Sequence, residues 1–202
     1  MGRPEKPLNG SIPEYLAELS VVLREQRRVT GRTFAELAEK TTVSAATLKR
    51  ATSGSSVPRI ETIRQFYAAC RPYLPREDQV PIWNATLKAW QLARMEERGT
   101  LHARRVRLDY IADRRDLSRE LQLFWEKKGA PSVRVIRKYS GDQIVLPLTS
   151  LERILRREAV PQTKRQLMAI VRGCFPTKLE EKKWEAAWDK VSRGYSLNGS
   201  AN

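Results

Sequence analysis

The side chains of this sequence that could do chemistry are mostly cationic. The 202 residues include 38 lysines and arginines against 23 aspartates and glutamates, which gives a formal net charge of +15 and a pI near 10.3. Both halves of the chain carry a basic excess. A surplus of this size favours polyanionic partners, so nucleic acid is the expected partner and an anionic membrane surface is a weaker alternative.

Groups for catalysis or metal binding are scarce in the sequence. His102 is the only histidine, and the two cysteines, Cys70 and Cys174, lie far apart. Metal sites and activated nucleophiles usually need several such groups close together. We therefore expect no enzyme, no cofactor and no bound metal, and two buried free thiols in a reducing compartment, with a single disulfide as the alternative.

The composition also bears on location. No stretch approaches the ~18 consecutive apolar residues of a membrane span, and the N-terminus has no apolar core typical of a secretory signal. The sequence predicts a globular protein of the cytoplasm, associated with the nucleoid, without a membrane partner and without an evident small-molecule ligand.

The positions that carry these charges must be held by helices, because the apolar spacing predicts an all-α fold. Tyr15, Leu16, Leu19 and Leu23 form one apolar stripe of an amphipathic helix that Gly31 ends. Thr33 with Glu36, and later Ser44, are typical N-caps of two short helices joined by a tight turn. The helices predicted for the first half cover residues 14–28, 33–38, 45–53, 59–70 and 79–90.

The second half repeats the first in a diverged form. The helices predicted there cover residues 117–128, 131–141, 151–158, 165–174 and 180–191. A repeat offset kept over many positions indicates an internal duplication. At an offset of 103, Leu48, Arg50 and Pro58 correspond to Leu151, Arg153 and Pro161; at 104, Ile63, Phe66, Tyr67 and Cys70 correspond to Leu167, Ile170, Val171 and Cys174.

The first half resembles a known family. The stretch TFAELAEKTTVSAATLKRATSG, then Val57-Pro58 and a helix ending in Ala69-Cys70, resembles the XRE (Cro/lambda-repressor-like) helix-turn-helix family. The triplets GRP and KPL at residues 2–4 and 6–8, with paired tryptophans after the domain, resemble its actinobacterial type. The resemblance covers about residues 1–92, and the second copy is much weaker.

Together, the helices and the resemblance predict two tandem lambda-repressor-like helix-turn-helix domains of about five helices each. The predicted order is an extended arm, the first domain, a basic helical connector, a diverged second domain and a disordered tail. These segments cover residues 1–13, 14–92, 93–116, 117–192 and 193–202 respectively. The arm could also enter a minor groove through Arg3, although a disordered leader is the simpler interpretation.

By resemblance, the helix that follows Ser44 is the recognition helix, which places its first turn in the major groove. Ala45, Ala46 and Lys49 would face outward, where lysine donates to guanine and methyl groups pack on thymine. Arg50 would contact a phosphate or an acidic neighbour. The alternative is that Lys49 and Arg50 only solvate an exposed helix.

The same resemblance implies phosphate contacts at two helix N-termini. Thr33 and Ser44 cap helices whose free N–H groups would point at the DNA backbone, with Arg32 and Arg59 beside them.

In the second copy, the equivalent surface is strongly basic, so this copy could also contact DNA. The alternative is a degenerate copy kept for packing or dimerisation, because a longer hydrophobic connection at residues 142–147 replaces the short turn. The candidate DNA contacts are Thr149, Ser150, Glu152, Arg153, Arg156 and Arg157 on the recognition helix, and Arg134, Arg137 and Lys138 on the helix before it.

The tryptophans could stack on single-stranded bases, but their helical spacing favours core or interface positions. They are Trp83, Trp90, Trp125, Trp184 and Trp188.

The predicted function is sequence-specific binding of double-stranded DNA, as a transcriptional regulator, for example a repressor, that reads two unlike half-sites. The same binding could instead serve replication, plasmid or phage maintenance, or transposition. A second class is a protein–protein adaptor with a degenerate second domain, and a homodimer or other protein partner stays open for each alternative.

Overall fold

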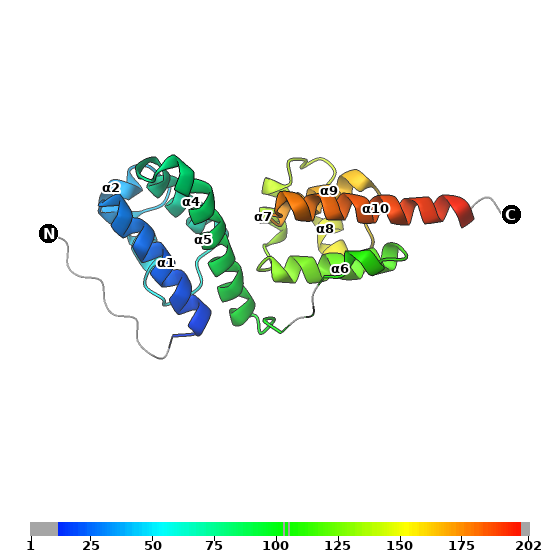
Figure 1. Cartoon of the computed structure of the whole chain (residues 1–202), viewed down its shortest axis with the longest axis horizontal. Coiled ribbons are helices and arrows are strands. Elements are labelled where there is room, and N and C mark those ends of the chain that lie inside the picture. The colour runs from blue at the N-terminus through cyan, green and yellow to red at the C-terminus, as the bar shows by residue number, and fades with distance from the viewer. Residues whose placement is uncertain (1–11, 103, 105, 199–202) are drawn as a thin grey trace. The chain divides into compact units, whose positions relative to one another are not determined.

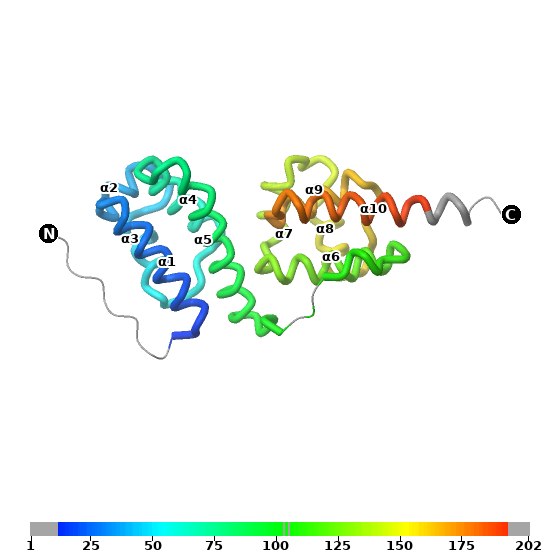
Figure 2. Tube along the Cα trace, viewed as in Figure 1, coloured from blue at the N-terminus to red at the C-terminus, as the bar shows by residue number. Residues whose placement is uncertain are grey.

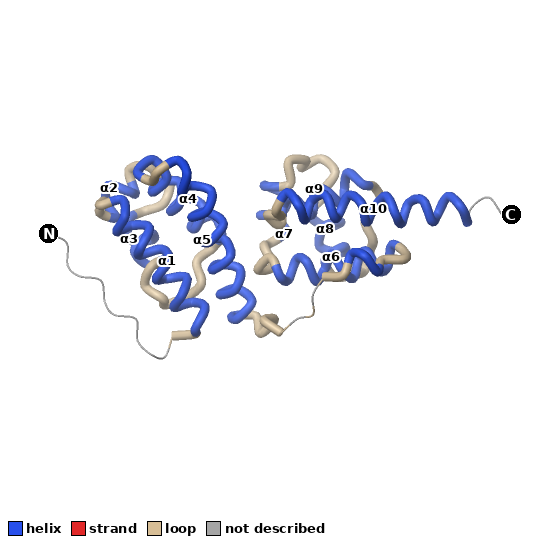
Figure 3. The backbone as a smooth tube through the Cα atoms, in the orientation of Figure 1, coloured by secondary structure: helices blue, strands red, loops and turns tan. Residues whose placement is uncertain are grey.

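The computed structural model describes residues 12–102, 104 and 106–198, and every regular element in that part is a helix or a 3-10 turn (Figures 1 and 3). This confirms the all-α prediction. The chain divides into two compact units, Met1–Leu101 and His102–Asn202. The predicted extended arm falls almost wholly on residues 1–11, which lie outside the described part. None of the described helices is apolar over a long enough stretch to cross a bilayer.

From residue 12 onward, the first unit contains two long helices that pack side by side and three shorter ones (Figure 2). A 3-10 turn, Arg71–Tyr73, follows the fourth helix. The five are α1 (Glu14–Thr30), α2 (Phe34–Ala38), α3 (Ala45–Ala51), α4 (Ile60–Cys70) and α5 (Arg76–Glu97).

Local signals in the sequence place the helix boundaries of this unit. Gly31 adopts a left-handed conformation with φ of 65° and ends α1. The Thr33 hydroxyl accepts a hydrogen bond from the N–H of Glu36, whose carboxylate accepts one from the Thr33 N–H, so the capping box predicted at α2 is confirmed. Ser44 caps α3 by accepting from the N–H of Thr47 at 3.2 Å.

The long fifth helix extends beyond its predicted limits of 79–90. It begins directly after Pro75, with Glu77 and Asp78 in the first turn, where carboxylates favour a helix N-terminus. It continues through Pro81 as far as Glu97. Helix α5 contributes Trp90 and Ala93 to the core of the unit. The other four helices contribute Leu19, Leu23, Leu37, Leu48, Ile63 and Phe66.

The prediction of a helical connector over residues 93–116 is wrong. Gly99, with φ of 67°, follows the end of α5, and the next regular element in the described part is a 3-10 turn at Leu108–Tyr110. Asp113 then caps α6 by accepting from the N–H of Asp116 at 2.7 Å. The helix-stopping glycine and the new cap separate α5 from α6, so Arg104 and Arg107 lie outside any helix.

The second unit again contains five helices in its described part, with long ones first and last (Figure 1). The last helix continues past residue 193, where the sequence predicts a tail, and residues 199–202 lie outside the described part. The five are α6 (Arg114–Lys127), α7 (Val133–Tyr139), α8 (Leu148–Leu155), α9 (Lys164–Gly173) and α10 (Lys178–Asn198).

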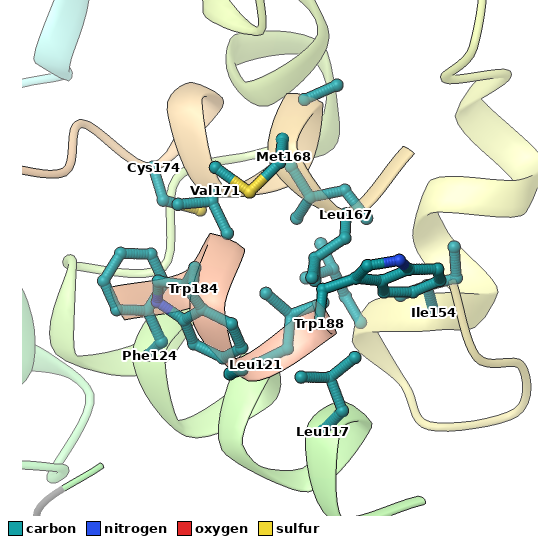
Figure 4. Close-up of a cluster of buried hydrophobic side chains, with 14 of the residues drawn as sticks. Leu117, Leu121, Phe124, Ile154, Leu167, Met168, Val171, Cys174, Trp184 and Trp188 are labelled. Atoms are coloured by element: carbon teal, nitrogen blue, oxygen red, sulfur yellow. The ribbon is translucent and has the colours of Figure 1, made fainter. Parts of the chain in front are cut away.

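An apolar cluster holds this unit together (Figure 4). Trp184 is 1% exposed and makes an edge contact with Phe124, with ring centroids 5.3 Å apart. Leu117 and Leu121 of α6 face α9 residues such as Leu167 across the cluster. Trp184 and Trp188 are buried here and Trp90 is buried in the first unit, so the core interpretation of these three tryptophans is confirmed.

Helices α7 and α9 approach each other closely at Gly173. A Cβ atom placed on this glycine would lie 2.4 Å from the backbone oxygen of Ile136 and 2.8 Å from its Cα. Because these are backbone atoms, a side-chain rotation cannot relieve the overlap. Glycine is therefore required for this packing.

Glu120 anchors the segment that leads into α6. Its side chain is 3% exposed, pairs with Arg104, and accepts a hydrogen bond from the N–H of Arg107 at 2.9 Å. Burial raises the pKa of Glu120, but the hydrogen bonds from Arg104 and Arg107 and the charges of Arg104 and Arg119 outweigh it, so the pKa lies below its ordinary value.

Gly173→Ala should destabilise the second unit by about 1–3 kcal/mol, the usual cost of overpacking. Helix propensity alone predicts the opposite sign, a gain of up to about 1 kcal/mol. Urea unfolding of the full chain measures the difference. A variant more stable than the wild type would contradict the close approach.

Glu120→Gln should lower the free energy of unfolding at pH 7 by about 1–3 kcal/mol, because the Arg104 pair and the Arg107 N–H lose a charged acceptor. Since the folded pKa is depressed, the carboxylate stabilises the fold above its unfolded pKa of about 4.3 and loses this effect as the pH falls further. The gap between variant and wild type should therefore narrow below about pH 4.

Thermal unfolding of the full chain at pH 7 and at pH 3.5 tests this dependence. Glu25→Gln, which breaks an exposed pair with Arg28, is the matched control and should leave the unfolding midpoint unchanged. A gap between Glu120→Gln and wild type that is equal at both pH values would exclude the proposed anchoring role of the charge.

Candidate nucleic-acid interface

Helix α3 divides its side chains between the core and the solvent. Leu48 is fully buried and Ala51 is 4% exposed, while Ala46, Lys49 and Arg50 are exposed. Of the three residues predicted to face outward, Ala46 and Lys49 are exposed and Ala45 is half-buried. The exposed face is a short strip of two methyl groups and two cations.

Contacts from distant segments fix the position of α3. The Nε atom of Arg24 on α1 donates to the carbonyl of Thr52, just after α3, at 2.9 Å. The indole N–H of Trp90 on α5 donates to the carbonyl of Pro58, in the loop after α3, at 2.9 Å. The chain that follows α3 is therefore tied to both long helices of the unit.

The two capped N-termini differ in charge. At α2, the Glu36 carboxylate already accepts from Thr33 and pairs with Arg32 at 3.1 Å, and its pKa is lowered by the hydrogen bonds from Thr33 and then from Arg32. At α3, no carboxylate occupies the first turn. The N-terminus of α3 is thus more open to an anion than that of α2.

Three predicted contact residues carry exposed charges. Across residues 12–102, 104 and 106–198, Lys49, Arg50 and Arg59 form no ion pair with another described residue. Arg32 is different, because it pairs with Glu36 and lies over the Tyr73 ring at 4.9 Å. The first three charges are available to a ligand without breaking a contact of the fold.

The structure adds the loop between α3 and α4 to the candidate surface. Ser53, Ser55 and Ser56 are exposed, and the Ser53 and Ser55 hydroxyl oxygens lie 2.8 Å apart. This loop lies in the chain between Arg50 and Arg59. The sequence run SGSS was its signal, but it indicated only a turn.

The region around α3 is similar to a known domain family. Residues 18–72 match the model of a helix-turn-helix domain family. The match covers α2, α3 and α4 with most of α1, and a domain of this type supports DNA binding. No curated protein and no solved structure shows significant similarity to the chain.

In the second unit, α8 takes the place that the sequence offset assigns to the recognition helix. It begins 103 residues after α3, and α9 begins 104 residues after α4. Leu151 and Ile154 are buried, as Leu48 and Ala51 are at the same offset. Leu146, in the longer connection, is fully buried, at the offset position of the half-buried Val43.

The charges of α8 are arranged differently from those of α3. Glu152 stands at the offset position of Lys49 and pairs with Arg156 at 2.7 Å. Pro147 precedes α8 and provides no side-chain cap, in contrast to Ser44. Arg153, Arg157 and Thr149 are exposed, and Ser150 is half-buried.

Helix α7 adds cations to this surface. Arg134 and Lys138 are exposed, and Arg137 is half-buried with its Nε atom donating to the carbonyl of Gln143 at 3.4 Å. Lys138 lies over the Tyr139 ring at 5.4 Å.

The two thiols stay outside this interface. Cys70 and Cys174 are free and buried, which confirms the prediction for both. Burial raises the pKa of Cys70 to about 12 and raises that of Cys174 as well, so neither thiol is an effective nucleophile near neutral pH.

Lys49→Ala and Arg50→Ala should each change the free energy of unfolding by less than about 0.5 kcal/mol, since exposed side chains without fold contacts contribute little. Leu48→Ala, on the opposite face of the same helix, should cost about 2–5 kcal/mol. Urea unfolding compares the three. A loss of stability in Lys49→Ala similar to that in Leu48→Ala would show that Lys49 supports the fold.

Proposed function

We propose that this chain is a sequence-specific double-stranded DNA-binding protein of the XRE type that regulates transcription, for example as a repressor. Binding to an operator would exclude or recruit polymerase. The net charge of +15 supplies the non-specific attraction to the phosphate backbone and would keep the protein at the nucleoid.

One observation carries the proposal. Within the matched helix-turn-helix residues, α3 is anchored on its buried face by Leu48 and presents Lys49, Arg50 and Ala46 to solvent without ion pairs among the described residues. A lysine in this position can donate to guanine O6 and N7, and a methyl group can pack on thymine. Arg50 and Arg59 would hold phosphates on either side.

The second unit is proposed to be a diverged second copy that contacts a different half-site. The shared helix order, the shared offset and the equivalent buried positions support the duplication. Arg153 would replace Arg50, and the cations of α7 would add phosphate contacts. Two half-sites about one helical turn apart would follow if both copies dock as a repressor dimer does.

A second candidate function is an adaptor in which only the first unit binds DNA. The pairing of Glu152 with Arg156 favours it. On the side of α8 that would face the DNA major groove, the Glu152 carboxylate repels phosphate, and DNA binding would have to remove water from both Glu152 and Arg156. Ile144, 86% exposed in the connection before α8, is an apolar contact that suits a protein better than DNA.

The decisive experiment is selection of source-genome fragments by the purified full chain at about 150 mM salt, followed by sequencing. Lys49→Ala and Arg153→Ala test the two units, with Lys88→Ala and Lys182→Ala as exposed controls of equal charge change. We expect a bipartite motif, with Lys49→Ala weakening one half by about 1–3 kcal/mol and Arg153→Ala affecting the other.

The outcomes of the selection distinguish the candidate functions. Loss with Lys49→Ala alone would support the adaptor function for the second unit. No motif, and variants equal to their controls, would exclude sequence-specific binding. Arg59→Ala should lower the salt slope by about one without changing the motif, because phosphate contacts position the protein and carry no sequence information.

A further inference from the structure

A groove with aromatic and cationic walls lies on the first unit between α4 and α5. Its volume is about 360 Å³. Tyr67 and Trp83 form its aromatic wall, with ring centroids 5.1 Å apart. Arg64 lies over the Trp83 ring at 5.6 Å. The lining residues are Arg64, Tyr67, Ala68, Arg71, Val80 and Trp83, and none of them is acidic.

The walls of the groove are held in place by hydrogen bonds. The Tyr67 hydroxyl donates to the carbonyl of Gln79 at 2.6 Å. The Gln79 side chain donates to the carbonyls of Arg71 and Leu74, at 3.3 and 3.2 Å. The 3-10 turn and the start of α5 are thus joined to α4. A preformed groove lowers the entropic cost of binding.

The groove lies at the end of α4 that is farther from α3 in the chain. Arg59 directly precedes α4, whereas Tyr67 lies near the C-terminal end of this helix and Arg71 lies beyond it. At a rise of about 1.5 Å per residue, the Cα atoms of Arg59 and Tyr67 are about 12 Å apart along the helix axis. A ligand in the groove would therefore leave α3 and the loop after it uncovered.

We propose that this groove binds an acidic peptide segment of a partner protein through an apolar anchor flanked by carboxylates. Val80, 66% exposed, and Ala68 offer an apolar floor beside the two rings. Arg71 is exposed and, with Arg64, gives the groove the charge that carboxylates complement. Tryptophan, tyrosine and arginine are the side chains enriched at the energetic centres of protein interfaces.

Single-stranded nucleic acid is the competing ligand for such a groove, since bases stack on aromatic rings. The Trp83 ring already contacts both Tyr67 and the Arg64 guanidinium, which reduces the ring surface left for a base. Tyr67 is fixed through its hydroxyl and only half-exposed at most. The open apolar area lies instead at Val80 and Ala68, where a branched or aromatic side chain of a peptide fits.

The test is selection of a random 12-residue peptide library, displayed on phage, against the immobilised full chain. Binding of the selected peptides, synthesised with a fluorescent label, is then measured by anisotropy. We expect peptides rich in aspartate and glutamate around an aromatic or branched residue. Arg71→Glu and Trp83→Ala should each weaken them about tenfold or more, whereas Lys88→Glu, an exposed residue of α5 with the same charge change, should have little effect.

Three outcomes would overturn the proposal. One is a selection without an acidic consensus. Another is equal binding to Arg71→Glu and Lys88→Glu, which would reveal only long-range attraction to a basic protein. The third is displacement of the peptide by a 12-nucleotide oligothymidine that binds the groove more tightly. Because Arg71→Glu should leave the selected DNA motif unchanged, failure here is separable from failure of the DNA-binding function.

Discussion

The burial of one face of a seven-residue helix is the constraint on which the rest of the first unit depends. A helix as short as α3 has no independent stability in water, because nucleation costs more than a few hydrogen bonds return. Leu48 and Ala51 bind it to the core, and Arg24 and Trp90 fix the chain after it. The opposite face of α3 is exposed and does not pack against the core, so it can carry cations and methyl groups.

Electrostatics sorts the many cations of the chain into two groups. Some pair with carboxylates of the fold: Arg104 with Glu120, Lys128 with Glu180 and Arg32 with Glu36. Others, such as Lys49 and Arg59, stay exposed and form no ion pair within the described part of the chain. The positive charges repel one another, and this repulsion from a net charge of +15 lowers the stability of the folded chain. An anionic partner that binds the exposed cations would reduce the repulsion.

The two units show how a shared helix order permits different surfaces. The positions that face the core stay apolar, with Ile154 in place of Ala51 and Leu146 in place of the half-buried Val43, because a close-packed interior excludes polar groups without partners. The exposed positions change in charge, from Lys49 to Glu152, since solvent imposes no such limit. Any difference in ligand between the units therefore resides in a few exposed side chains.

The sequence by itself determined the features that depend on near neighbours. Helix boundaries at Gly31, Thr33 and Ser44 follow from caps formed within three or four residues, and the apolar period identified Leu48 as buried. Only the tertiary structure decided the anchoring of the chain by Glu120 and the groove at Tyr67 and Trp83. These features join residues from different segments, so local spacing carries no signal for them. The availability of Lys49 and Arg59 is of the same kind, because it depends on which carboxylates the fold brings near.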